Sequence, residues 1–154
     1  MPGLFFDDYE TPVYRPPSEA ESFILRVTRG CAHNHCTYCN MYRGVQFEKL
    51  TDEEIMRQIA MAYSVDRDGV RRVFLADGDA LVLETERLLK ILNTLKKYFP
   101  NLERVASYAA PGDILRKSVE ELTQLREAGL QILYYGMESG DSQTLRDIRK
   151  GVDG

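Results

Sequence analysis

The chain has 154 residues, of which 44% are hydrophobic and 29% are charged. These fractions are close to the averages of globular domains, which excludes a disordered or collagen-like chain. Lysine and arginine together number 20, and aspartate and glutamate 24, so the net charge is −4. This negative net charge gives no strong indication of nucleic-acid binding, because binding a phosphate backbone through bulk charge needs a basic surface.

The N-terminal segment carries no recognisable targeting sequence. A short apolar run at positions 4–6 is followed by two aspartates, where a signal peptide would have a small-residue cleavage site. No apolar run approaches the roughly 20 residues that span a bilayer, so we expect no membrane segment and a cytoplasmic protein. Four prolines predict that residues 1–21 form an extended arm lying on the domain, with a flexible terminus as the alternative.

Beyond the arm, β-prone runs alternate with amphipathic helical patterns. The expected strands are residues 23–28, 72–76, 104–109 and 131–135. The expected helices are residues 52–65, 84–98, 118–129 and 141–150, the first and third of which open with capping-box patterns. A turn is expected at Pro111 and Gly112. Such alternation predicts a parallel sheet with helices packed outside it and right-handed crossovers.

The predicted fold class is therefore α/β, as a parallel (β/α) partial TIM-like barrel with about four βα units of an expected six. Four units do not close a barrel by themselves. We expect residues 22–154 to be a core domain truncated on its C-terminal side. The alternative is an open half-barrel that is complete as it stands or is completed by another chain.

Unusual polar residues follow each predicted strand. The cysteines come after the first strand, Asp77 and Asp79 after the second, Ser107 and Tyr108 near the end of the third, and Glu138 after the fourth. In parallel sheets and barrels, ligands bind at the carboxyl ends of the strands. The sequence therefore predicts that four loops converge on one site.

Three cysteines, Cys31, Cys36 and Cys39, fall within nine positions. An odd number of cysteines in one short loop is not a disulfide framework. The C-x-x-C pair allows two thiolates to hold one metal ion or one face of a cluster. Three thiolates suit a [4Fe–4S] cluster with one iron left open; the alternatives are zinc completed by His33 or His35, and unrelated thiols. Zinc is less favoured, because the sequence has no second cysteine pair to complete such a site.

The segment around these cysteines resembles the Cys loop of the radical S-adenosylmethionine (radical SAM) enzymes. In that family the loop directly follows the first strand of a βα repeat. The usual spacing is C-x3-C-x2-C, whereas this chain has C-x4-C-x2-C. Some branches share the Arg29-Gly30 pair before the first cysteine and the aromatic Tyr38 before the last. The resemblance extends over residues 23–151.

The resemblance implies a set of ligand-binding residues. Each cysteine would bind one iron of a [4Fe–4S] cluster, and the amino and carboxylate groups of SAM would chelate the fourth iron. Tyr38 matches a position near the adenine. Asp77, Gly78 and Asp79 fall where the family has a Gly-Gly-Glu segment contacting the methionine amine. Glu138 matches an acidic position that meets the ribose hydroxyls, and Tyr108 is a further candidate for the cofactor site.

The resemblance also implies a reaction. A reduced cluster would cleave SAM reductively to a 5′-deoxyadenosyl radical, which abstracts hydrogen from a substrate that the sequence does not specify. Electrons would come from a donor such as a flavodoxin or ferredoxin. The alternative is a non-catalytic metal-binding, iron–sulfur or electron-transfer module, although electron transfer does not need carboxylates near the cluster. A third hypothesis is that this short chain binds the cluster poorly and has no catalytic activity.

Overall fold

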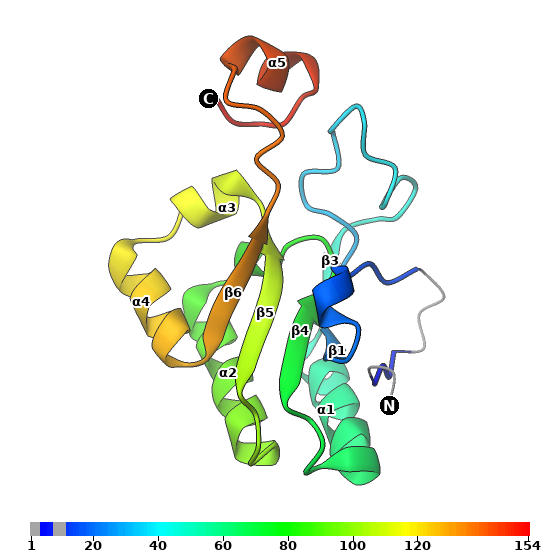
Figure 1. Cartoon of the computed structure of the whole chain (residues 1–154). Coiled ribbons are helices and arrows are strands. Elements are labelled where there is room, and N and C mark those ends of the chain that lie inside the picture. Colours follow the sequence, from blue (N-terminus) through cyan, green and yellow to red (C-terminus); the bar gives the residue numbers. More distant parts are fainter. Residues whose placement is uncertain (1–3, 8–11) are drawn as a thin grey trace.

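The computed structural model describes residues 4–7 and 12–154. At its centre lies a parallel four-stranded sheet with the strand order β1-β4-β5-β6 (Figure 1). The strands are β1 (Phe23–Arg26), β4 (Arg72–Ala76), β5 (Arg104–Ala109) and β6 (Leu130–Tyr135). Spatial neighbours follow chain order, and a helical segment separates each strand from the next. The predicted α/β fold with parallel βα units is confirmed.

The helices begin where the sequence places their caps. Thr51 and Ser118 both form capping boxes, which open α1 (Asp52–Asp66) and α4 (Val119–Glu127). The chain also forms α2 (Thr85–Tyr98), α3 (Pro111–Leu115), α5 (Ser142–Asp147) and two short 3-10 helices, η1 (Pro17–Glu19) and η2 (Ala80–Val82). Within the described part of the chain, none of the helices is both long and apolar enough to cross a membrane.

The largest differences from the prediction are in three segments. The expected turn at Pro111 and Gly112 is wrong, because a short helix, α3 (Pro111–Leu115), begins there, and proline is well suited to the first helical position. The first strand ends at Arg26, and the next residues form β2 (Thr28–Arg29), which pairs antiparallel with β3 (Glu48–Lys49). Helix α5 ends three residues before Lys150.

The two faces of the sheet pack against different parts of the chain. On one face, Leu25, Leu75 and Val105 pack with buried side chains of α1, α2 and α4 in the main hydrophobic core. On the other face, Ile24 and Phe74 belong to a smaller cluster. This division follows from the twofold alternation of side chains along a strand.

The described part of the arm contacts the sheet. Phe5 pairs in parallel with Ile24 on the free edge of β1. Near the other end of the arm, Glu19 is fully buried and accepts hydrogen bonds from Tyr134 at 2.6 Å and Arg104 at 2.7 Å. The arm thus contacts both β1 and, through Glu19, the strands β5 and β6. Residues 1–3 and 8–11 of the predicted arm lie outside the described residues.

Candidate functional site

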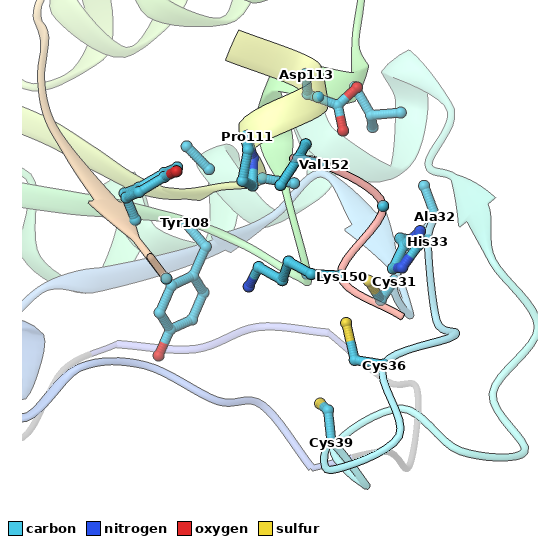
Figure 2. Close-up of a pocket in the computed structure, with 18 of the residues that line it drawn as sticks. Cys31, Ala32, His33, Cys36, Cys39, Tyr108, Pro111, Asp113, Lys150 and Val152 are labelled. Carbon is cyan, nitrogen blue, oxygen red and sulfur yellow. The ribbon is translucent and has the colours of Figure 1, made fainter. Parts of the chain in front are cut away.

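A cavity of about 700 Å³ lies at the carboxyl ends of the strands. Its wall combines the Cys loop, the ends of β5 and β6, helix α3 and the segment after α5 (Figure 2). Seven of the nine predicted site residues line it: Cys31, Cys36, Tyr38, Cys39, Gly78, Tyr108 and Glu138. The structure therefore brings together residues that lie up to 107 positions apart in the sequence.

The three cysteines are free and partly exposed. Figure 2 shows all three on one loop that borders the cavity. Burial raises the pKa of the Cys36 thiol, whereas the nearby charge of Lys150 lowers it. Among the residues that the structure describes, no three His, Cys, Asp or Glu side chains are grouped so as to hold a single metal ion.

Local backbone contacts shape the Cys loop. Gly30 precedes the first cysteine with a φ of 74°, a conformation that glycine adopts without steric cost. Asn34, with a φ of 44°, donates its backbone N–H to Cys31 Sγ at 3.5 Å and its side-chain amide to the carbonyl oxygen of Tyr42 at 3.0 Å. Asparagine is among the residues that best tolerate this left-handed conformation. The first and last parts of the loop are therefore linked across its middle.

The chain after α5 returns to the Cys loop. The Thr37 N–H donates to the carbonyl oxygen of Ile148 at 3.0 Å, and His33 Nε2 donates to that of Arg149 at 2.7 Å. Positive φ angles at Arg149 and Gly151 turn the backbone at this point. The contact brings a segment more than 100 residues away onto the cysteine-bearing loop.

Lys150 is a pocket residue that the sequence analysis did not identify. Its Nζ lies 3.1 Å from Glu138 Oε1 and donates to the hydroxyl oxygen of Tyr38 at 3.3 Å. Tyr38 and Lys150 together hold the pKa of Glu138 below its usual value, while burial and Glu138 raise the pKa of Tyr38. The sequence placed Lys150 at the end of a helix, and only the turn after α5 directs it into the cavity.

Asp77 and Asp79 lie beneath the cavity wall and do not line it. Both carboxylates are buried and bind groups of the chain itself: Asp77 accepts from the Gly30 N–H, and Asp79 from the backbone N–H groups of Leu81 and Ala110. Burial raises the pKa of Asp77, and it raises that of Asp79 to about 6. Their predicted contact with a methionine amine stays a prediction.

The residues at the end of β5 differ in their surroundings. Ser107 is buried and donates to the carbonyl oxygen of Leu75, away from the cavity. Tyr108 lines the cavity, and its ring packs edge-on against Phe74 with 5.2 Å between centroids. Burial raises the pKa of Tyr108, so its hydroxyl stays protonated at neutral pH. Tyr108 thus serves both the small cluster and the cavity wall.

The donor set fits an iron–sulfur cluster. Thiolates are the ligands that iron–sulfur clusters use, and three of them from one loop would leave one iron of a [4Fe–4S] cluster without a cysteine ligand. His33, one of the two histidines in the Cys loop, donates from Nε2 to the Arg149 carbonyl oxygen. A ligand in the open position would meet Tyr38, Tyr108 and Glu138 in the same cavity.

Fold and site together define an α/β protein with a thiol-bordered ligand cavity at the carboxyl ends of a parallel sheet. Residues 25–153 match the sequence profile described as the Radical SAM superfamily. Because the match covers most of the chain, the protein belongs to the radical SAM superfamily. The resemblance inferred from the Cys loop is confirmed.

A solved structure supports the fold assignment. The chain is similar to one described as the cobalamin-dependent S-adenosylmethionine radical enzyme OxsB with aqua-cobalamin bound, with a TM-score of 0.63 and 20% sequence identity. The similarity covers 85% of this chain but only 20% of that one. The chain thus spans about one fifth of the length of this structural neighbour. No curated protein sequence matches.

Proposed function

We propose that the protein is a [4Fe–4S]- and SAM-dependent radical enzyme. The observation that carries the proposal is the placement of three cysteines of one loop at the edge of a cavity formed at the carboxyl ends of four parallel strands. Family membership supports the same chemistry. In this proposal Cys31, Cys36 and Cys39 hold three irons of the cluster.

The remaining cavity residues would bind SAM. Tyr38 and Tyr108 offer aromatic surface for the adenine, and Glu138 offers a carboxylate for the ribose hydroxyls. Lys150 is held between Tyr38 and Glu138, which keeps their polar groups at fixed positions before any ligand arrives. Preorganised groups of this kind orient a ligand at low entropic cost.

Cys31, Cys36 and Cys39 would hold a cluster that, when reduced, would supply one electron for the reductive cleavage of SAM to methionine and a 5′-deoxyadenosyl radical, which would abstract hydrogen from a substrate. The protein positions the reacting groups and excludes water. We infer that a flavodoxin or ferredoxin supplies the electron.

Anaerobic reconstitution with iron and sulfide tests the proposal. We expect about four irons and four sulfides per chain, as a [4Fe–4S] cluster requires. Adding SAM to the dithionite-reduced sample should change the paramagnetic resonance signal of the cluster and yield 5′-deoxyadenosine. A variant with all three cysteines changed to alanine is the matched control. Failure to bind iron and sulfide would refute the proposal, whereas a cluster without any response to SAM would favour an electron-transfer module.

A further inference from the structure

The polar contacts beneath the Cys loop converge on one buried carboxylate. Asp77 follows β4 and is fully buried. Its Oδ2 accepts the Gly30 N–H at 3.2 Å, and its Oδ1 accepts the Tyr42 hydroxyl at 3.2 Å. Gly30 directly precedes Cys31, and Tyr42 lies three residues after Cys39. One side chain therefore holds both ends of the segment that carries all three cysteines.

Asp77 is itself held on several sides. Its N–H donates to Thr28 Oγ1 at 3.3 Å, and Arg26 Nε lies 3.6 Å from Oδ2. Arg26 is fully buried and forms a 2.7 Å ion pair with Asp7 of the arm. A buried carboxylate needs such partners, because an unpaired charge in the interior is strongly destabilising.

The loop ends are well packed where Asp77 binds them. Tyr42 is only 4% exposed, and its ring lies edge-on to that of Tyr14 at 5.6 Å. The next residue after Asp77, Gly78, lies directly against Cys31. Fixing two ends of a loop removes conformations that the free segment would sample. The cysteines between the two ends, in contrast, are free and partly exposed.

We propose that Asp77 is a positioning residue for the cluster: by tying Gly30 to Tyr42, it sets the spacing of the cysteine-bearing loop before iron binds. The inference rests on the proposed function, because a positioned loop matters only if the loop holds a cluster. In this proposal Asp77 acts through the loop, since it is fully buried and is not among the residues that line the cavity. The assignment explains why a carboxylate stands at this buried position.

Tyr42→Phe removes one hydroxyl and keeps the packed ring, so it is the mildest test. Asp77→Asn removes the charge at nearly constant volume. The controls are Tyr63→Phe and Asp68→Asn, which change the same residue types at more exposed positions. In the metal-free protein, hydrogen exchange of the backbone amides of residues 30–43 should be roughly two- to tenfold faster in both test variants, which is the effect of losing one hydrogen bond. The controls should exchange like the wild type.

After reconstitution, the Asp77→Asn variant should lose iron to a chelator faster than the Asp68→Asn control, and its reduced cluster should give an altered paramagnetic resonance spectrum. A purely structural role would lower overall stability without changing that spectrum. The Asp77→Asn/Tyr42→Phe double variant should be no worse than Asp77→Asn, because Tyr42 acts through Asp77. Wild-type exchange rates in Tyr42→Phe, or additive effects in the double variant, would overturn the proposal. The exchange experiment uses metal-free protein, so its outcome is independent of whether the protein is a radical enzyme.

Discussion

Gly78 is the residue whose substitution most directly tests the geometry of the site. A Cβ atom at this position would lie 2.8 Å from Cys31 Cα, 2.8 Å from the carbonyl oxygen of Gly30 and 3.0 Å from Cys31 Cβ. Nonbonded carbon atoms prefer separations of about 3.5–4.0 Å. Gly78→Ala must therefore displace the first cysteine or the turn after β4 by about 0.5–1 Å.

The size of the effect follows from two opposing contributions. Forcing an extra methyl group into a packed site costs about 1–3 kcal/mol. Replacing glycine by alanine also reduces the conformational entropy of the unfolded chain, and this offsets about 0.4–1 kcal/mol of that cost. We expect the free energy of unfolding of Gly78→Ala to fall by roughly 1–2 kcal/mol, and its iron content after reconstitution to fall because Cys31 is displaced.

Urea denaturation of the metal-free protein and iron analysis of the reconstituted protein measure the two effects. Gly112→Ala is the matched control for stability, because Gly112 also lines the cavity but has no atom within 4 Å of an added Cβ. It lies in the first turn of α3, where alanine should be neutral or stabilising by about 0.5–1 kcal/mol. Equal stability and equal iron content in the two variants would refute the close approach of Gly78 to Cys31.

Three other substitutions test separate parts of the site. Cys36→Ala leaves two thiols in the loop, so the reconstituted protein should lack a [4Fe–4S] cluster; iron and sulfide analysis at wild-type levels would contradict this. Asp79→Asn should flatten the pH dependence of stability. The folded-state pKa of Asp79 is raised from 3.8 to about 6, so its stabilising effect is complete below pH 3.8 and is lost as the pH rises through 6, a change of up to about 3 kcal/mol. Urea denaturation from pH 3.8 to above pH 6 should show the wild type losing stability relative to Asp79→Asn as the pH rises. Lys150→Met should raise the pKa of Glu138, since it removes the neighbouring cation, and an NMR titration of the Glu138 carboxyl that shows no change would exclude the contact.

The sequence predicted the main elements well because their signals are local. Both capping boxes lie within four consecutive residues, and each marks a helix start that the structure confirms. The small antiparallel pair of β2 and β3 was missed for the opposite reason. Its two-residue strands lie about 20 positions apart, so that neither carries a periodic pattern of its own.

The candidate site was predictable to the extent that topology determines it. Parallel strands place all their carboxyl ends at one edge, so residues following four strands had to come close together. The direction of each side chain was not predictable in this way. Asp77 and Asp79 follow β4 as expected, but the turn directs both carboxylates toward backbone N–H groups and away from the cavity. A carboxylate in a strand-end loop is equally suited to bind a ligand or to satisfy its own backbone.

Lys150 shows why long-range backbone contacts decide which residues enter the site. In the sequence it is one cation of an expected helix, with no pattern that sets it apart. The helix ends early, and the following turn binds the Cys loop through the carbonyl oxygens of Ile148 and Arg149. The two segments on either side of the cavity therefore support each other, while Asp77 holds the Cys loop from below. A loop that must present three thiols to one ligand needs such supports, because its own residues supply few buried contacts to hold it in place.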